Sequence, residues 1–179
     1  MDARPLLDLI AAQGAGESAV LVGIGGHGAA GKTTLARMVP GAQIVATDEF
    51  WNGASFDLAR LSREVIVPLA GGRAATFASY DWSARTPRGE RTIEPRGVVV
   101  VEGVCALHTT LRDAYAVRVW VEAAREVRLA RAVARDGEAA RRTWVEVWLP
   151  SEERYVKRDD PVRCAHLVVD GGRGLDDRG

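Results

Sequence analysis

The segment from Gly26 to Thr33 fits the pattern G-x-x-x-x-G-K-[ST] at every position. It follows the apolar run Ala19–Ile24, which is typical of a strand buried on both faces of a parallel sheet. A helix is expected to begin at Lys32 and to continue to about Met38. The order of strand, glycine-rich turn and helix is the context in which this pattern cradles phosphate groups. These residues therefore predict a phosphate-binding loop in an α/β protein, with a chance glycine-rich turn as the alternative.

Each residue type in this loop has a physical reason to bind a nucleotide. Glycines let backbone N–H groups turn inward into an anion-binding nest, and the start of a helix adds partial positive charge. Lys32 is expected to reach the outer phosphates, and the Thr33 hydroxyl to bind Mg²⁺, so ATP and Mg²⁺ are the expected cofactors. The His27 side chain is expected to point outward into solvent. The expected phosphate-binding residues are Gly26, His27, Gly28, Ala29, Ala30, Gly31, Lys32, Thr33 and Thr34.

Strands and helices are expected to alternate along the rest of the chain. Further strands are expected at 43–46, 98–101, 116–121 and 166–169, and helices at 5–12, 58–69, 123–135 and 138–157. Pro150 is a candidate break in the last helix, and the polar stretch 83–97, which contains Pro87, Gly89 and Pro95, is expected to be a loop or a small excursion from the main fold. The alternation predicts a P-loop NTPase fold with a parallel sheet flanked by helices. No linker divides the chain, so a single domain is expected over residues 1–179.

Two carboxylates follow expected strands and are candidates for the chemistry. Asp48 comes just after the strand 43–46, and the carboxyl ends of the strands face the ligand crevice in such sheets. It is expected to orient an attacking hydroxyl; a helix N-cap is the alternative role, and its neighbour Glu49 is a weaker candidate. Glu102 follows four valines and is expected to support Mg²⁺ through a bound water, with a solvated carboxylate as the alternative.

Together these residues resemble the uridine kinase and phosphoribulokinase group of P-loop small-molecule kinases over about Val20 to Asp170. Residues 24–34, 47–51 and 99–103 resemble the group's phosphate loop, its Asp-x-Phe-aromatic segment and its Glu-Gly strand end. Four further elements follow the group's order, at 55–57, 80–82, 128–136 and 165–169. The resemblance implies a kinase that phosphorylates an alcohol group, with Asp48 as the base for the acceptor hydroxyl.

The chain departs from uridine kinases around the acceptor. Only Asn52-Gly53-Ala54 remains of a loop that carries an Asp for the ribose hydroxyls, and Arg85 lies at about the position of a histidine that contacts uracil. The implied acceptor contacts are Trp51, Tyr80, Asp81 and Arg85. A nucleoside-like acceptor is the leading expectation, and an anionic or heavily hydroxylated molecule is the alternative. A sugar, pantothenate or ribosyl-cofactor kinase stays open, as does a regulatory ATP-binding protein without an acceptor.

Four arginines, at 128, 131, 135 and 142, would share one face of a continuous helix. The family pattern implies a mobile helical lid over about 135–150, although Gly137–Arg142 lacks the usual Arg-Gly-Arg. Its arginines would neutralise charge on the transferred phosphoryl group. Arg131 and Arg135 are the preferred catalytic candidates, beside Lys32 and Asp48. Because all basic residues but Lys32 and Lys157 are arginine, a solvated helix face is the alternative.

Composition restricts the partners. Lys+Arg and Asp+Glu both total 24, and a formal net charge of zero is not typical of proteins that coat nucleic acid or anionic membranes. No apolar run approaches the roughly 20 residues of a membrane helix, and two cysteines, Cys105 and Cys164, fit a reducing compartment. We therefore expect a cytoplasmic protein that binds ATP and a small hydroxyl-bearing substrate. Assembly into a homo-oligomer stays open.

Overall fold

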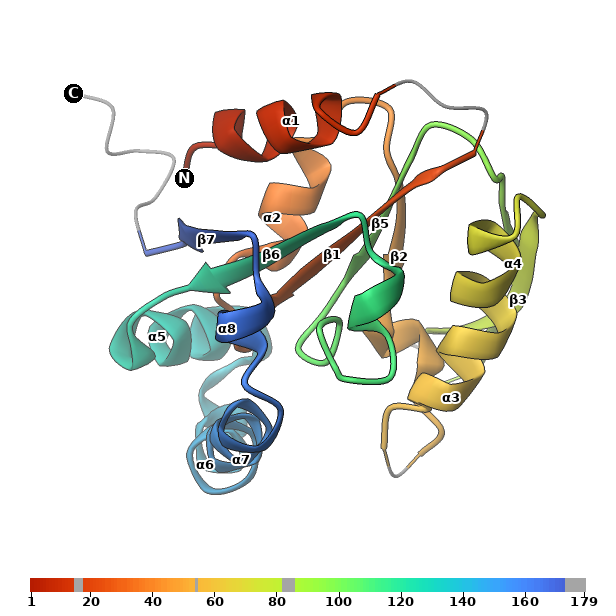
Figure 1. Cartoon of the computed structure of the whole chain (residues 1–179). Coiled ribbons are helices and arrows are strands. Elements are labelled where there is room, and N and C mark those ends of the chain that lie inside the picture. Colours follow the sequence, from red (N-terminus) through yellow and green to blue (C-terminus); the bar gives the residue numbers. More distant parts are fainter. Residues whose placement is uncertain (15–17, 54, 82–85, 173–179) are drawn as a thin grey trace.

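The computed structural model describes residues 1–14, 18–53, 55–81 and 86–172. Five strands form its central sheet: β1 (Val20–Gly26), β2 (Gln43–Ala46), β5 (Val98–Glu102), β6 (Val117–Glu122) and β7 (Leu167–Asp170). The strand order is β2-β5-β1-β6-β7, and all four pairings are parallel. Helices lie on both sides of this sheet (Figure 1). The predicted α/β architecture is confirmed.

The helical elements occupy most of the segments between the strands. They are α1 (Arg4–Ala11), α2 (Lys32–Arg37), α3 (Leu58–Leu61), α4 (Val67–Ala70), α5 (Arg125–Asp136), α6 (Arg141–Thr143), α7 (Leu149–Asp159) and α8 (Pro161–Cys164). Short 3₁₀ helices η1 (Thr47–Phe50), η3 (Arg112–Ala114) and η4 (Glu138–Ala140) and π-helical turns η2 (Ser62–Ile66) and η5 (Trp144–Trp148) connect or extend them. None of the helices in the described ranges is long and apolar enough to cross a membrane.

The valine-rich strands bury side chains on both faces of the sheet. In β5, Val99 and Val101 belong to one apolar cluster and Val100 to the other, because successive side chains of a strand alternate. The cluster of Val100 also contains Leu6 from α1 and Leu35 from α2. The opposite cluster contains side chains of the continuous helical segment α3-η2-α4. Burial on both faces explains why these strands are apolar at almost every position.

Two glycines of β1 let other elements reach the sheet. A Cβ atom at Gly23 would lie 2.5 Å from the Tyr115 ring, and one at Gly25 would lie 2.9 Å from Leu107. Leu107 and Tyr115 come from the segment that follows β5, which therefore packs directly over the centre of the sheet. This segment forms one wall of the candidate site described below.

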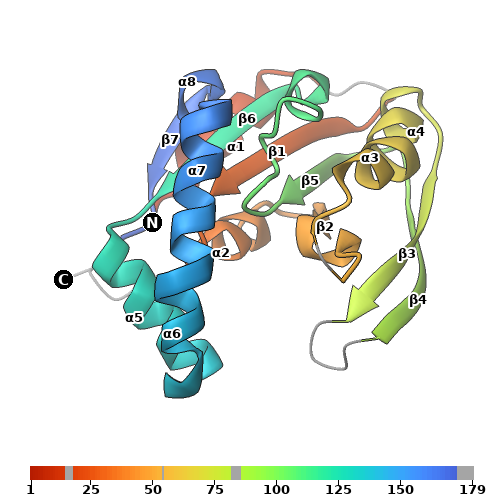
Figure 2. The same ribbon diagram turned by 90° about the horizontal axis from the view of Figure 1, so that it is seen from below.

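The expectation of a loop is wrong for residues 86–93, which belong to a small hairpin excursion, while 83–85 lie outside the described residues. Residues Thr86–Ile93 form a strand, β4, which pairs antiparallel with β3 (Ala75–Asp81) in a separate two-stranded sheet. In Figure 2 this hairpin lies at the opposite side of the molecule from α5, α6 and α7. β4 has a partner on one side, so Pro87 and Gly89 interrupt no central ladder. Its charged, proline-containing sequence therefore looks like a loop although it pairs along its length.

The lid region also differs from expectation in two details. The chain stays helical through Pro150, because the π-turn Trp144–Trp148 precedes the proline, which lies in the first turn of α7, where a missing N–H costs little. The arginine-bearing helix, in contrast, is not continuous. α5 ends at Asp136, and Gly137, with φ 89° and ψ 161°, turns the chain. Arg142 therefore does not continue the face of Arg131 and Arg135.

Candidate active site

The glycine-rich loop joins β1 to α2 at the carboxyl end of the central strand, between β5 and β6. Ala29 has a φ of 58° and Gly31, the N-cap of α2, a φ of 108°. Left-handed residues of this kind turn backbone N–H groups toward a common centre. The Lys32 side chain is buried, and its Nζ donates a hydrogen bond to the backbone oxygen of His27 at 2.7 Å. The loop thus has the curled conformation that its sequence predicts.

Thr33 and Glu102 form the second part of the site. The Thr33 hydroxyl donates a hydrogen bond to Glu102 Oε1 at 2.7 Å, across the gap between the loop and the end of β5. Burial raises the pKa of Glu102, while the Thr33 hydrogen bond and the Lys32 charge oppose that rise. Two oxygen ligands of the type Mg²⁺ prefers therefore lie side by side. Since no group of three or more His, Cys, Asp or Glu side chains among the described residues forms a metal cluster, the remaining ligands would have to come from phosphate and water.

Asp48 lies in η1, directly after β2, as its sequence position predicts. Asp48 is exposed to solvent and lines the cavity described below. Desolvation raises the pKa of Asp48, and the charges of Lys32 and Arg135 oppose the shift. Desolvation likewise lowers the pKa of Lys32, against the pull of Glu102, Glu152 and Asp48. These charges therefore act on one another within one site.

Glu49, the weaker candidate, points elsewhere. Its carboxylate accepts hydrogen bonds from Arg91 Nη1 at 2.5 Å and from the Ala46 backbone N–H at 3.1 Å. Arg91 belongs to β4, so Glu49 ties the hairpin to the end of β2. This geometry favours Asp48 over Glu49 as the carboxylate that faces a ligand.

A cavity of about 1050 Å³ lies over the loop and brings most of the predicted residues together. The predicted residues that line it are Gly28, Ala29, Gly31, Lys32, Thr33, Thr34, Asp48, Glu102, Arg131 and Arg135. Arg131 also donates to the backbone oxygen of Gly171 at 2.7 Å, and Arg135 pairs with Asp136 at 2.7 Å and lies over the Trp144 ring. Both arginines therefore face the cavity from α5 while anchored to neighbouring groups.

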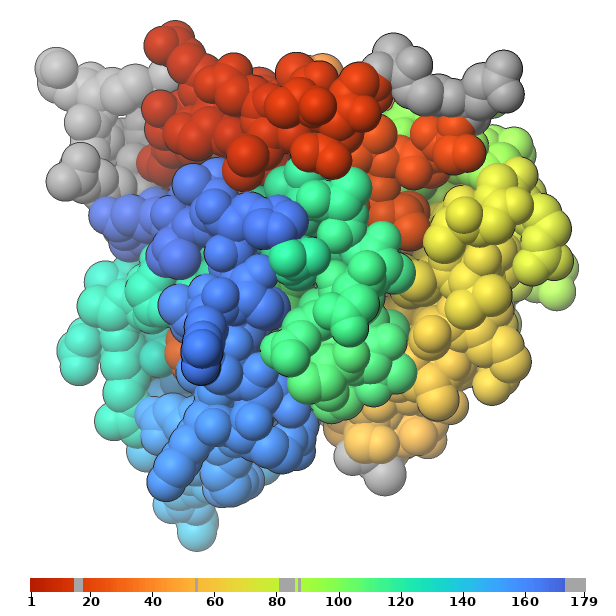
Figure 3. Space-filling view, viewed as in Figure 1, coloured from red at the N-terminus to blue at the C-terminus, as the bar shows by residue number. Residues whose placement is uncertain are grey.

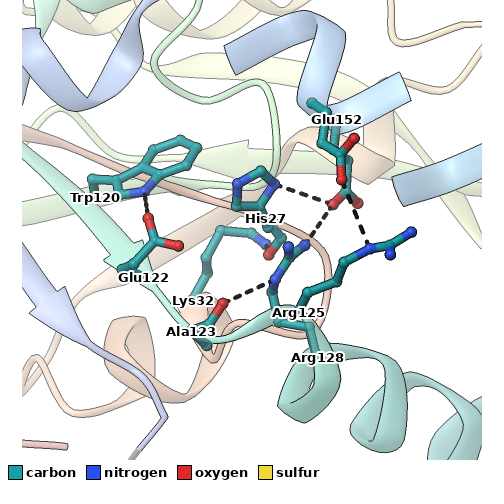
Figure 4. A network of polar contacts seen from close by, with 9 residues as sticks. His27, Lys32, Trp120, Glu122, Ala123, Arg125, Arg128 and Glu152 are labelled. Carbon is teal, nitrogen blue, oxygen red and sulfur yellow. Dashed lines mark hydrogen bonds and ion pairs between the residues drawn. The ribbon is translucent and has the colours of Figure 1, made fainter. Parts of the chain in front are cut away.

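The side chain of His27 is buried, which corrects the expectation that it points into solvent. Its Nδ1 lies 3.4 Å from Glu152 Oε2, and its ring meets the edge of Trp120 at 5.5 Å. Glu152 also accepts a hydrogen bond from Arg128 Nη1 at 3.3 Å, and all three residues are buried. Figure 4 shows this network between the loop, α5 and α7. Arg128 is thus a buried structural partner of Glu152 rather than a lining residue of the cavity.

Gly28 is the point of closest approach between the loop and the helices above it. A Cβ atom there would lie 2.5 Å from Glu152 Oε1 and 2.7 Å from the Trp144 ring. Only a glycine lets α7 come so near to the loop. The helical segment 144–155 therefore forms a roof over the phosphate loop.

Of the four residues implied as acceptor contacts, neither Trp51 nor Tyr80 lines the cavity. The Trp51 ring packs against Phe56 at 5.3 Å and Trp148 at 6.3 Å, both of which line the cavity, but Trp51 itself lies behind them. Tyr80 is half-buried in β3 and lines neither that cavity nor the smaller hollow beside it. Asp81 ends β3, and Arg85 lies outside the described residues.

Several lining residues were missed from the sequence. Trp148, Ser151, Glu152 and Tyr155 line the cavity from the segment that leads into and through α7, and Val104 and Cys105 line it after β5. The first four recur at helical spacing, i, i+3, i+4 and i+7, which marks a common helix face. That face mixes polar and aromatic side chains, so the pattern alone does not distinguish a cavity wall from a solvated helix.

Comparison with known proteins decides the family. The model of the phosphoribulokinase/uridine kinase family matches residues 45–159. The chain belongs to this family. The match begins after the phosphate loop, so the loop and the family match are independent observations. The expected family, and with it the expected class of phosphotransferases, is confirmed.

Individual relatives of this family are distant. A uridine kinase from Alkaliphilus metalliredigens is 27% identical over 83% of this chain and 79% of its own length. A uridine kinase from Macrococcus caseolyticus is 38% identical, but over 44% of this chain and 39% of its own length. A solved structure described as a possible uridine kinase from Bacillus stearothermophilus superposes with a TM-score of 0.68 at 16% identity, covering 93% of this chain and 100% of that one. This last likeness confirms the P-loop kinase fold.

Proposed function

We propose that this protein is an ATP- and Mg²⁺-dependent kinase that transfers the γ-phosphoryl group of ATP to a hydroxyl of a small metabolite. The observation that carries the proposal is the convergence of a complete phosphate loop, Glu102 and Asp48 on one cavity. The volume of about 1050 Å³ is ample for a nucleotide and a small acceptor together. The names of the relatives make a nucleoside the first acceptor to test.

Each residue has a role that its position supports. The loop amides and Lys32 bind the β- and γ-phosphates, and Thr33 with Glu102 would hold Mg²⁺, whose charge would offset that of the phosphates. Asp48 accepts a hydrogen bond from the acceptor hydroxyl and takes its proton as the oxygen bonds to phosphorus and ADP leaves. Arg131 and Arg135 stabilise the charge on the transferred group from the α5 side. Closure of the segment 135–150 would exclude water, as a lid does in phosphoryl transfer.

The decisive experiment is ATP turnover with and without acceptors. A kinase releases ADP faster when a suitable nucleoside, sugar or other hydroxylated metabolite is added, whereas a regulatory ATP-binding protein does not. The Lys32→Ala variant should lose most of this turnover, about 100-fold or more, because the phosphates lose their point charge. Far-UV circular dichroism should be unchanged, since Lys32 contacts a backbone oxygen of its own loop. Full turnover in Lys32→Ala would refute the proposal.

A further inference from the structure

The Lys32 ammonium is held by the backbone of His27. The His27 backbone oxygen accepts hydrogen bonds from Lys32 Nζ at 2.7 Å and from the Ala30 backbone N–H at 3.2 Å. An ammonium group has three N–H donors, so this contact leaves others for the oxygens of a phosphate. The position of the His27 backbone therefore determines where the Lys32 charge meets a bound nucleotide, and any group that fixes His27 also acts on Lys32.

The His27 side chain lies between two elements outside the loop. On one side its ring meets the edge of Trp120 in β6, with 5.5 Å between the ring centroids and 77° between the ring planes. Trp120 is fully buried, and its Nε1 donates a hydrogen bond to Glu122 Oε2 at 2.8 Å, which fixes the indole. On the other side, His27 Nδ1 lies 3.4 Å from Glu152 Oε2 on α7. The ring thus connects the central sheet with the roof over the phosphate loop.

Glu152 is in turn fixed by the neighbouring helix α5. Arg128 donates hydrogen bonds from Nη1 to Glu152 Oε2 at 3.3 Å and from Nε to the Ala123 backbone oxygen at 3.0 Å. Figure 3 shows α5, in teal, and α7, in blue, side by side on one face of the molecule, and Figure 4 shows the side chains that join them to His27. One carboxylate therefore connects α5, α7 and the phosphate loop.

The contact between His27 and Glu152 falls just short of a hydrogen bond. At 3.4 Å it exceeds the usual N–H···O distance of about 2.7–3.2 Å, and His27 Nδ1 has no hydrogen-bond partner among the described residues. A buried nitrogen without a partner costs free energy, which favours a movement that brings Glu152 closer. Hydrogen bonds in active sites are often long in the free enzyme and shorten when the ligand binds. A shift of roughly 0.5 Å would complete this one.

The charge of Glu152 gives this bond a second effect. A Cβ atom at Gly28 would lie 2.5 Å from Glu152 Oε1, so the carboxylate packs directly against the backbone of the loop. A carboxylate in this place repels phosphate groups unless cations or N–H donors offset its charge. Arg128 and the His27 ring are placed to do so. A hydrogen bond from His27 would therefore both fix the loop and reduce this repulsion.

We infer that His27 is a positioning residue, which couples the closure of the roof to the placement of Lys32. The inference rests on the proposed kinase function. When ATP and Mg²⁺ bind, the roof approaches the loop, and His27 Nδ1–H donates a hydrogen bond to Glu152 Oε2. The ring is then held between Glu152 and Trp120, and the His27 backbone oxygen holds Lys32 toward the phosphates. The His27 side chain itself contacts no phosphate in this scheme.

The hydrogen bond is tested by NMR of the histidine rings. The chain has three histidines, His27, His108 and His166, so each signal is assigned by its loss in one variant. We expect Mg²⁺ with a non-hydrolysable ATP analogue to produce a slowly exchanging, downfield-shifted Hδ1 signal of His27. Binding of the analogue without such a signal overturns the inference. An analogue that leaves the loop amides of the parent protein unmoved would instead refute the proposed function, on which the inference depends.

Nucleotide affinity tests the link from His27 to Lys32. His27→Ala should weaken binding of the analogue with Mg²⁺ about tenfold or more, the effect of losing one hydrogen bond to a charged group. His27→Asn should restore most of the affinity, because the amide nitrogen of asparagine can donate to Glu152 in place of Nδ1. In a Lys32→Ala background, His27→Ala should have little further effect, because the group that His27 positions is already absent. Calorimetric titration of these variants measures each dissociation constant.

His108 provides the matched control outside the phosphate loop. Its Nε2 lies 3.6 Å from Asp159 Oδ2 on α7, and its ring stacks on that of Tyr155 with 6.3 Å between the centroids. His108→Ala thus removes a similar pair of contacts and should leave the affinity for the analogue unchanged. A merely structural role of His27 would lower Tm in His27→Ala without a change in affinity. That result, or an equal loss of affinity with and without Lys32, overturns the inference.

Discussion

Asp48 is the proposed base for the acceptor hydroxyl. Asp48→Asn keeps the size of the side chain but cannot accept the proton of the acceptor hydroxyl. We expect phosphoryl transfer to fall about 100-fold or more, the scale of a positioned acid–base group. ATP affinity should weaken far less, or tighten slightly, because a negative charge near the phosphates is removed. Steady-state kinetics and ATP titration of the same variant separate the two effects.

Asp57 provides the matched control. It is the N-cap of α3, and its Oδ1 accepts a hydrogen bond from the Arg60 backbone N–H at 2.9 Å. An asparagine caps a helix about as well as an aspartate, so Asp57→Asn should retain both turnover and stability. Normal turnover in Asp48→Asn beside an inactive Asp57→Asn would mean that the wrong carboxylate has been assigned.

The raised pKa of Asp48 also has a consequence for stability. A carboxyl group whose pKa is raised on folding binds its proton more tightly in the folded chain than in the unfolded chain. The free energy of unfolding therefore falls as pH rises from the ordinary aspartate pKa through the raised value, and the loss persists at neutral pH. Asparagine does not ionise, so Asp48→Asn should have a higher Tm than the parent at pH 7. Calorimetry between pH 4 and 7.5 should show the difference shrinking toward pH 4, and a lower Tm at pH 7 would contradict this reasoning.

At the scale of elements, α7 is held to α5 by the buried pair of Arg128 and Glu152. Both side chains are 6% exposed, so the loss of one partner leaves a buried charge. Arg128→Met and Glu152→Leu should each lower the free energy of unfolding by about 3 kcal/mol or more. The double variant should lose less than the sum, since no uncompensated charge of the pair remains. Denaturant unfolding of the parent, the two single variants and the double variant completes a double-mutant cycle, which measures the coupling energy between Arg128 and Glu152.

The neighbouring pair of Arg125 and Glu153 is the control for this cycle. It joins the same two helices at 3.8 Å, but its side chains are 51% and 56% exposed. Arg125→Met should therefore cost less than about 1 kcal/mol. Equal losses in Arg125→Met and Arg128→Met would show that burial does not determine the strength of the α5–α7 connection.

Elements that form the central sheet could be predicted because their signals are local. β5 consists of valines at four successive positions, and β1 runs into a loop with a complete motif. The hairpin could not be predicted in this way. Strand β4 pairs with one other strand and has a charged sequence, so neither apolar alternation nor strand propensity identifies it. The continuity of the helix at Pro150 depends on a π-turn, which lies upstream of the proline and leaves no clear mark in the sequence.

At the scale of the whole molecule, the phosphate side and the acceptor side of the site differ in how well the sequence predicts them. Lys32, Thr33, Asp48 and Glu102 lie at strand ends or in the loop, so position along the chain predicts where they meet. His27 is buried by Glu152 and Trp120, which lie far away in the sequence. The walls formed by α7 and by the segment after β5 likewise depend on tertiary packing. The residues of the phosphate side can therefore be predicted from the sequence, whereas those of the acceptor side are identified only in the structure.

The metal should bind to this protein only together with a nucleotide. Thr33 and Glu102 offer two oxygen ligands, and no cluster of three or more His, Cys, Asp or Glu ligands occurs among the described residues. Mg²⁺ alone should therefore leave Tm unchanged, whereas Mg²⁺ with a non-hydrolysable ATP analogue at about 100 times its Kd should add about 2.7 kcal/mol. For a chain of 179 residues this corresponds to a rise of about 5–10 °C. Removal of the metal with EDTA should reverse most of the rise in Tm, because the phosphate charges then face Glu102 and Asp48 without the charge of the metal. Thermal unfolding with Mg²⁺ alone, with the ATP analogue alone and with both measures these changes in Tm. A higher Tm with Mg²⁺ alone would contradict a metal site that is shared between the protein and the nucleotide.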